Sequence, residues 1–84
     1  MIMEKYRKEI NSIDDELVKL LERRFNVVLK IGHYKKEHDL PVYDEAREKV
    51  VIENCVSKLE NKNYSRHIED VYHQIMDTCK NLEK

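Results

Sequence analysis

The stretch Met3–Tyr34, MEKYRKEINSIDDELVKLLERRFNVVLKIGHY, decides the fold of this 84-residue chain. When it is read in alternating steps of three and four residues, nine of ten positions are apolar or aromatic, and only Arg24 is not. The positions of this seam are Met3, Tyr6, Ile10, Ile13, Leu17, Leu20, Arg24, Val27, Ile31 and Tyr34. The repeat predicts a helix whose seam packs against another helix. A guanidinium does not lose its proton there, so we expect Arg24 to bind an anionic ligand.

Length and composition indicate a single all-α domain over residues 1–84. The chain has one Gly, one Pro and no Trp, and 39% of its residues are charged, which is typical of long helices joined by few turns. At this size a single core is barely sufficient, so we expect an oligomer. Sixteen basic residues nearly balance seventeen acidic ones. This balance disfavours nucleic acid and anionic membranes as partners and favours a small molecule or a protein.

The chain shows neither an export signal nor a membrane-spanning stretch, so the sequence predicts a cytoplasmic protein. Cys55 and Cys79 are too few and too far apart for a disulfide scaffold, and Cys55 is interpreted as a small buried residue. The four histidines lack a spacing that would gather metal ligands on one helical face. They are His33, His38, His67 and His73. We therefore expect no metal and no cofactor.

Three helices are predicted. The first runs over about Met3–Glu37 and ends before Pro41, because proline disfavours helical backbone in the residue that precedes it. At about 1.5 Å per residue it would be roughly 50 Å long, too long to be covered by its own chain. The second is expected from Asp44, as its N-cap, to about Leu59, and the third is expected to begin with Ser65 as its cap. The apolar positions of the third helix are Ile68, Val71, Tyr72, Ile75, Met76 and Cys79.

Gly32 lies inside the first predicted helix, where a glycine costs about 1 kcal/mol relative to alanine. Its presence indicates either the close approach of another backbone or a ligand, or a helix irregularity without a function.

Cationic side chains on the first predicted helix suggest a shared ligand. Arg24 and Lys35 are eleven residues apart, which places them within about 20° of one face and about 16 Å apart along the axis. Two long side chains at that spacing can converge on one ligand. Arg7 lies about 25 Å from Arg24 along the helix and on a different side. If both residues serve one site, Arg7 must come from a partner chain.

The segment after Pro41 carries Asp44, Arg47 and Glu48 at spacings that place them on one helical face. Taken alone, this pattern is typical of an ordinary helix start with an internal ion pair. Its context gives it more weight.

In their order along the chain, these segments resemble the all-helical, AroQ class of chorismate mutases. The matching segments are Arg7 before Ile10, Ile13 and Asp14, then Leu20–Arg24, then Gly32 followed by Lys35, and finally Leu40–Asp44 leading to Arg47 and Glu48. The resemblance covers nearly the whole chain. Any one segment is a weak signal, but their order and spacing together are specific.

The resemblance implies an intertwined homodimer of three-helix chains, in which the two long helices cross and each active site uses both chains. It implies the pericyclic rearrangement of chorismate to prephenate in aromatic amino acid biosynthesis, without a cofactor. Arg24 and the partner's Arg7 would bind the two substrate carboxylates. Lys35 would donate to the ether oxygen and to a carboxylate, and Glu48 would accept from the ring hydroxyl. Asp44 would lie nearby.

By the same resemblance, Arg47 would help to bind or orient the acidic groups. Two positions of the third helix depart from the common pattern, and the loop before them is one residue shorter, so their register is open. Cys79 falls where a small hydroxyl residue is usual, and it would either weaken a carboxylate contact or simply pack. Glu83 falls where many relatives carry Gln. As a carboxylate it would repel the ether oxygen, so it must be protonated to help catalysis, unless it is only a solvated charge at the chain end.

Three alternatives remain open at this point. An isochorismate pyruvate-lyase shares the fold and most of the cationic site. A non-catalytic helical dimerisation or regulatory module would also show an apolar seam, but it gives no reason for Arg24 to lie in it. The domain could also dock on another enzyme of aromatic amino acid synthesis without any visible motif.

Overall fold

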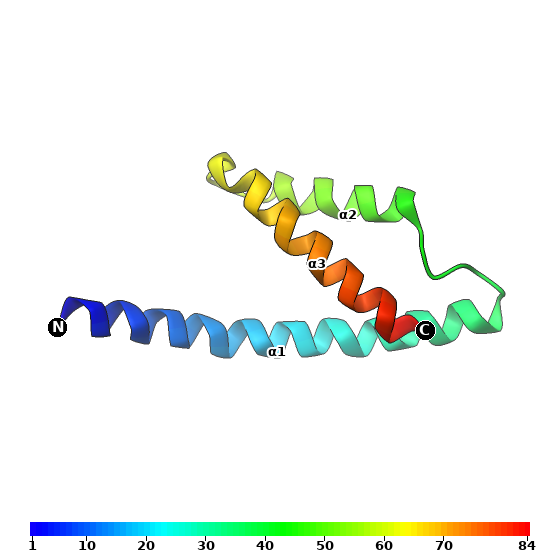
Figure 1. Cartoon of the computed structure of the whole chain (residues 1–84), viewed down its shortest axis with the longest axis horizontal. Coiled ribbons are helices and arrows are strands. Elements are labelled where there is room, and N and C mark those ends of the chain that lie inside the picture. The colour runs from blue at the N-terminus through cyan, green and yellow to red at the C-terminus, as the bar shows by residue number, and fades with distance from the viewer.

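The computed structural model describes residues 1–84, which form three α-helices, one short 3₁₀ helix and no strand. The helices are α1 (Ile2–Glu37), α2 (Glu45–Ser57) and α3 (Ser65–Glu83), and the 3₁₀ turn η1 (Lys62–Tyr64) precedes α3. Figure 1 shows α1 as a long rod, with α2 and α3 folded back over its C-terminal half. The longest dimension of the chain is 56 Å. The prediction of an all-α chain with one very long N-terminal helix is confirmed.

A left-handed residue ends α1. Asp39 has a φ of 53°, and the N–H of Leu40 donates to the carbonyl of Lys35 at 2.8 Å. This bond is typical of a Schellman turn, in which a residue beyond the helix satisfies a carbonyl of its last turn. The helix therefore ends before Pro41, where the sequence predicted, although the turn at Asp39 rather than the proline closes it.

The start of α2 agrees with the prediction, and its end does not. Asp44 is the N-cap, and its Oδ1 accepts a hydrogen bond from the N–H of Arg47 at 3.0 Å. The helix ends at Ser57 rather than near Leu59. Beyond its end, the Nζ of Lys62 donates to the carbonyls of Val56 and Ser57, each at 3.0 Å, and so helps to satisfy the carbonyls of the last turn.

The predicted capping role of Ser65 is wrong. Ser65 is already helical, with φ −54° and ψ −50°, and its hydroxyl donates back to the carbonyl of Lys62 at 2.7 Å. An N-cap needs an extended backbone so that its side chain can accept from the helix N–H groups. Asn61 does this one turn earlier, where its side chain accepts from the N–H of Asn63 and begins η1.

Helix α3 packs against α1 and also contacts α2. The buried apolar side chains are few, namely Val28, Met76 and Cys79. Gly32 is buried where α1 meets the last turn of α3, and a Cβ at this position would lie 2.9 Å from the Cα of Glu83. Of the two interpretations of Gly32, the structure therefore supports the close approach of another backbone.

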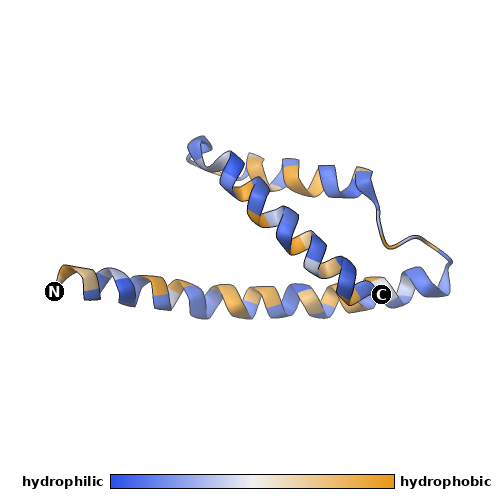
Figure 2. Ribbon diagram, viewed as in Figure 1, coloured by the Kyte–Doolittle hydropathy of each residue, from blue (hydrophilic) through white to orange (hydrophobic).

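The predicted seam is not covered by its own chain. Its nine apolar or aromatic residues remain between 43% and 57% exposed. Figure 2 shows the corresponding apolar bands recurring along α1, including the half that projects beyond α2 and α3. A long apolar strip of this kind is typical of a helix with an interaction partner.

Candidate active site

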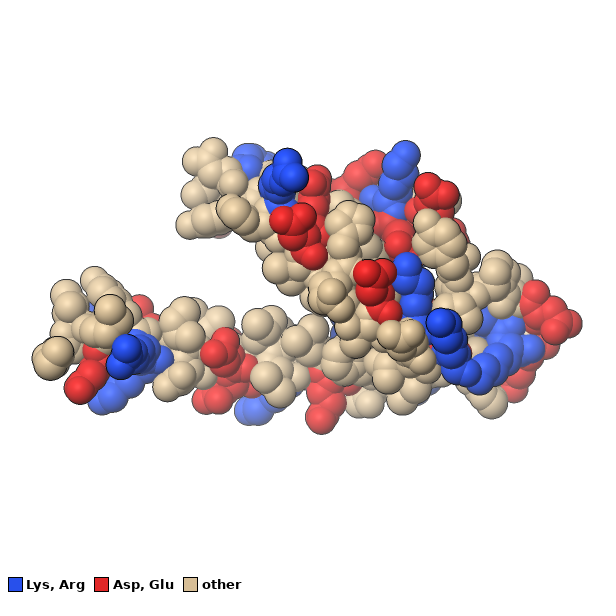
Figure 3. All heavy atoms as spheres, in the orientation of Figure 1, with Lys and Arg blue, Asp and Glu red and all other residues tan.

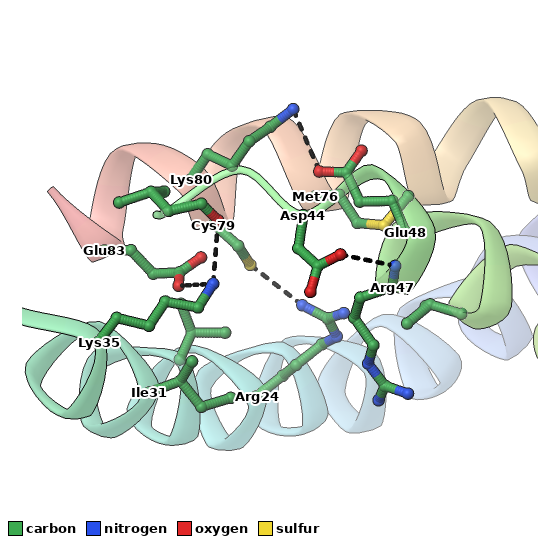
Figure 4. Close-up of a pocket in the computed structure, with 13 residues that line it drawn as sticks. Arg24, Ile31, Lys35, Asp44, Arg47, Glu48, Met76, Cys79, Lys80 and Glu83 are labelled. Carbon is green, nitrogen blue, oxygen red and sulfur yellow. Dashed lines mark hydrogen bonds and ion pairs between the residues drawn. The ribbon is translucent and has the colours of Figure 1, made fainter. Parts of the chain in front are cut away.

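A pocket of about 230 Å³ lies between the C-terminal half of α1, the beginning of α2 and the C-terminal half of α3. Figure 4 shows Arg24 and Lys35 extending from α1 toward the side chains of α2 and α3. The residues that line it are Arg24, Val28, Ile31, Lys35, Val42, Asp44, Arg47, Glu48, Val51, Met76, Cys79, Lys80 and Glu83. Seven of the eight candidate site residues from the sequence are among them, and Arg7 is not.

The pocket is rich in charged groups and carries one more positive than negative charge when all of them are ionised. Its bases are Arg24, Lys35, Arg47 and Lys80, and its acids are Asp44, Glu48 and Glu83. Figure 3 shows basic and acidic side chains side by side around the C-terminal part of the molecule. A small enclosure with several fixed cations is suited to a compact organic anion.

Arg24 is held in place by α3. Its Nη1 donates to the Sγ of Cys79 at 3.1 Å, and its guanidinium carbon lies 5.9 Å from the centre of the Tyr72 ring. Cys79 is only 4% exposed. Burial raises the pKa of the Cys79 thiol, and the neighbouring Arg24 partly offsets this rise. Cys79 therefore packs as a neutral thiol that orients Arg24, in line with the packing alternative.

Lys35 is fixed by two contacts at the other end of the pocket. Its Nζ donates to the carbonyl of Val42 at 2.9 Å and lies 2.7 Å from the Oε1 of Glu83. Glu83 is only 9% exposed, and this oxygen is buried without a hydrogen bond of good geometry. Glu83 is therefore not a solvated charge at the chain end. Its carboxyl group lies against the cation that the resemblance assigns to the ether oxygen.

The acidic residues at the start of α2 do not form the internal ion pair expected of an ordinary helix start. Asp44 accepts from the backbone of Arg47 rather than from its guanidinium. Glu48 instead pairs with Lys80 of α3, with 3.3 Å between Oε2 and Nζ. The guanidinium of Arg47 forms no ion pair within the chain, and Arg47 is exposed. It is therefore available to a ligand.

Lys80 is a pocket residue that the sequence reasoning missed. It contacts Glu48, lies 3.1 Å from Asp77, and lies 4.7 Å from the centre of the Tyr43 ring. Hydrogen bonds to Asp77 and then to Glu48 raise the pKa of Lys80, so it stays charged throughout the neutral range. A signal was present, because Lys80 follows Met76 at a four-residue step and interrupts the apolar face of α3 as Arg24 interrupts the seam of α1.

Arg7 lies in the uncovered N-terminal half of α1, far from this pocket. The first pocket residue of α1 is Arg24, seventeen residues and about 25 Å further along the helix.

No helix of the chain combines the length and apolarity needed to cross a bilayer. No three His, Cys, Asp or Glu side chains come together in a cluster that could bind a metal ion.

Fold and pocket together define an all-helical protein with one pocket lined by four basic and three acidic side chains. The family model for chorismate mutase type II matches residues 6–84. The chain belongs to this family, as its resemblance to the AroQ class predicted. The family's reaction is the isomerisation of chorismate to prephenate in aromatic amino acid biosynthesis.

Curated relatives agree with this assignment. The chain is 30% identical over 87 residues to a bifunctional chorismate mutase/prephenate dehydratase of Aquifex aeolicus, with 98% of this chain and 24% of the relative aligned. It is 35% identical over 71 residues to the T-protein of Haemophilus influenzae, with 83% and 19% aligned. A bifunctional chorismate mutase/prephenate dehydratase of Buchnera aphidicola subsp. Schizaphis graminum is 40% identical over 58 residues, with 69% and 15% aligned.

The chain thus spans no more than about a quarter of the length of these relatives. No solved structure matches it significantly.

Proposed function

We propose that this chain catalyses the rearrangement of chorismate to prephenate at the pocket between its three helices. The observation that carries the proposal is that Arg24 and Lys35 of α1 reach one pocket, with Glu48 on the wall formed by α2. In this reaction an ether C–O bond breaks while a C–C bond forms, and no nucleophile is needed. The protein has to hold a flexible dianion in its compact conformer and stabilise the charge that develops on the ether oxygen.

The pocket supplies groups for each of these tasks. Arg24, oriented by Cys79, offers a planar fork to a carboxylate. Lys35, oriented by the carbonyl of Val42, donates to the ether oxygen. Glu48 accepts from the ring hydroxyl, and Arg47 binds or orients the acidic groups.

A second copy of the chain completes the site in this proposal. The pocket carries one excess positive charge, whereas the substrate carries two negative ones. The partner's Arg7 would supply the missing charge. The exposed seam of α1 gives the second copy a surface to cover, and a shared apolar interface of two crossing helices is what the repeat favours.

Glu83 affects the proposed reaction through Lys35. Its carboxyl group lies 2.7 Å from the Nζ of Lys35, so when ionised it neutralises the cation that should face the ether oxygen. A neutral hydrogen-bond donor at this position would leave Lys35 free for the ether oxygen and would itself donate.

The test is the loss of chorismate absorbance on adding the purified protein, with the product identified by NMR. We expect prephenate, and we expect Arg24→Ala to lower kcat/KM by about 10²- to 10³-fold, as loss of one partner of a hydrogen-bonded charge pair does elsewhere. Arg23→Ala is the matched control, because Arg23 is exposed and does not line the pocket. No turnover by a folded wild-type protein would contradict the proposal, and pyruvate release from isochorismate would indicate the lyase instead.

A cytoplasmic location and docking on another enzyme of aromatic amino acid synthesis stay predictions from the sequence.

A further inference from the structure

Lys80 is the one basic residue of the pocket that has no role in the proposed reaction. Its side chain is 26% exposed and that of Glu48 is 22% exposed, whereas that of Asp77 is 64% exposed. Of its two ion pairs, the one with Glu48 is therefore sheltered in the pocket and the one with Asp77 lies at the surface. Figure 4 shows the Lys80 ammonium beside the Glu48 carboxylate.

The role proposed for Glu48 creates an electrostatic difficulty. Its carboxylate has to accept a hydrogen bond from the ring hydroxyl while the substrate beside it carries two further carboxylates. Like charges at such short range favour protonation of one of them. A protonated Glu48 would lose part of its acceptor capacity and would turn a donor toward the hydroxyl.

Lys80 is placed where it removes this difficulty. Its Nζ lies 3.3 Å from Oε2 of Glu48, and no hydrogen bond or ion pair of the chain engages Oε1. Oε2 of Glu48 is thus paired with the Lys80 ammonium, while Oε1 is free to accept a hydrogen bond from the substrate. A fixed ammonium at this distance favours the ionised carboxylate and restricts its rotation.

We propose that Lys80 is a positioning residue, which keeps the carboxylate of Glu48 ionised and turned toward the ring hydroxyl without contacting the substrate itself. The inference rests on the proposed function and extends it to a residue of α3. It predicts that substitutions of Lys80 change kcat/KM only by altering Glu48, and not by altering another group of the pocket.

Other charged groups also surround Glu48, and the test has to separate them from Lys80. These groups are Arg24 and Lys35 of α1, Asp44 at the start of α2 with Arg47 of α2, and Asp77 and Glu83 of α3. Only Lys80 is within ion-pair distance of Glu48. Asp77 competes with Glu48 for the same ammonium, so Asp77→Asn should leave the pair with Glu48 intact.

The first test compares Lys80→Met with Lys80→Arg and with Lys49→Met, a control lysine on α2 that is exposed and forms no ion pair. We expect Lys80→Met to lower kcat/KM by about tenfold at neutral pH, in the range of coupled neighbouring charges. Lys80→Arg should restore most of the activity, and Lys49→Met should behave as wild type. Circular dichroism checks folding, and Lys80→Gln replaces the Met variant if that one does not fold.

A double-mutant cycle with Glu48→Gln shows whether Lys80 acts through Glu48. A glutamine carries no charge and needs no cation behind it, so Lys80→Met should change kcat/KM by less than about twofold in this background. A tenfold loss in both backgrounds would overturn the inference, because Lys80 would then act independently of Glu48.

The last test does not depend on activity. The side-chain carboxyl carbon of Glu48 is followed by ¹³C NMR in the ligand-free protein at one neutral pH. We expect its resonance to move in Lys80→Met and to stay unchanged in Lys49→Met, because only Lys80 lies within ion-pair distance of this carboxylate. An unchanged resonance in Lys80→Met would overturn the Lys80 inference even if the enzyme is active. Absence of chorismate turnover by the wild type would overturn the proposed function instead.

Discussion

The two halves of α1 carry the same apolar seam but lie in different surroundings. Every residue before Leu21 is exposed, whereas from Leu21 onward a second stripe of α1 is sheltered by the rest of the chain. The sheltered positions of this stripe are Leu21, Phe25, Val28, Gly32 and Lys35, each one residue beyond a seam position. In the N-terminal half the equivalent positions are Glu4, Arg7, Asn11, Asp14 and Val18. Four of these five are polar, so that half offers α3 no apolar face.

The difference shows that one helix can carry two interfaces, one along the seam and one along the stripe of residues that follow each seam position. The chain folds on itself only where the second stripe is mostly apolar or small, with Lys35 as the one charged residue among its sheltered positions. The nine apolar or aromatic residues of the seam stay available to a second molecule along the whole helix, whereas Arg24 of the seam contacts α3. Arg7 falls on the second stripe in the half that the chain leaves uncovered, so we expect it to serve a partner rather than its own fold.

Breaking the seam in the uncovered half should have the largest effect. Leu17→Glu would place carboxylates in an apolar interface between two chains, which is strongly unfavourable. We expect sedimentation to show a monomer and kcat/KM to fall by more than about a hundredfold, because no pocket would then receive the partner's Arg7. Ser12→Glu adds the same charge at an exposed position off the seam and should change neither quantity. A fully active Leu17→Glu monomer would contradict a role for the seam.

Mixing two defective chains tests whether the halves of α1 belong to different sites. Arg7→Ala and Arg24→Ala homodimers should each be nearly inactive. If the partner's Arg7 enters the pocket, random exchange of chains gives heterodimers with one intact site, and activity should return to about a quarter of the wild-type level. If Arg7 acts within its own chain, or not at all, no mixture will exceed the activity of its components.

Glu83→Gln sharpens the comparison within the covered half, where Glu83 meets Lys35. The carboxylate of Glu83 pairs with Lys35 and only accepts hydrogen bonds, whereas an amide leaves Lys35 free and can itself donate. We therefore expect Glu83→Gln to raise kcat/KM at neutral pH. An unchanged or lower kcat/KM in a folded Glu83→Gln protein would refute this role of Glu83.

The smallest effect is expected at Gly32, where the covered half meets α3. Alanine is favoured over glycine in a helix by about 1 kcal/mol. Here, however, its Cβ would meet the backbone of Glu83 at 2.9 Å, and such overpacking costs roughly 1–3 kcal/mol. We expect Gly32→Ala to lower the urea midpoint slightly, whereas Asn26→Ala, at an exposed position of α1, should raise it. A Gly32→Ala protein stabilised as much as the control would mean that the end of α3 yields without cost.

Local signals in the sequence predicted what local forces decide. The seam repeat located α1, and the N-cap chemistry of Asp44 located the start of α2, since both depend on residues within a turn or two. The side chains of Arg24, Lys35 and Glu48 line one pocket, as their spacing and the family pattern suggested. Their roles in catalysis stay predictions.

The remaining features depend on contacts between residues that are far apart in sequence. The role proposed for Lys80 depends on its ion pair with Glu48. Glu48 lies thirty-two residues earlier, and no periodicity in the sequence links the two positions. The end of α2 lies at Ser57 rather than near Leu59, and the Nζ of Lys62 donates to the last two carbonyls from beyond the helix. Serine is a residue type that often caps helices, but the backbone of Ser65 is already helical because η1 begins the turn before it.

The turn after α1 also determines how freely Lys35 can move. The backbone carbonyl of Lys35 accepts from the N–H of Leu40, and its ammonium donates to the carbonyl of Val42. The short loop after α1 therefore holds both the backbone and the side-chain end of Lys35. A free lysine side chain loses roughly 1.5–2 kcal/mol of rotational entropy when it is immobilised. For Lys35 that loss occurs when the protein folds. A ligand therefore meets an ammonium whose position is already fixed, and binding does not have to immobilise this side chain again.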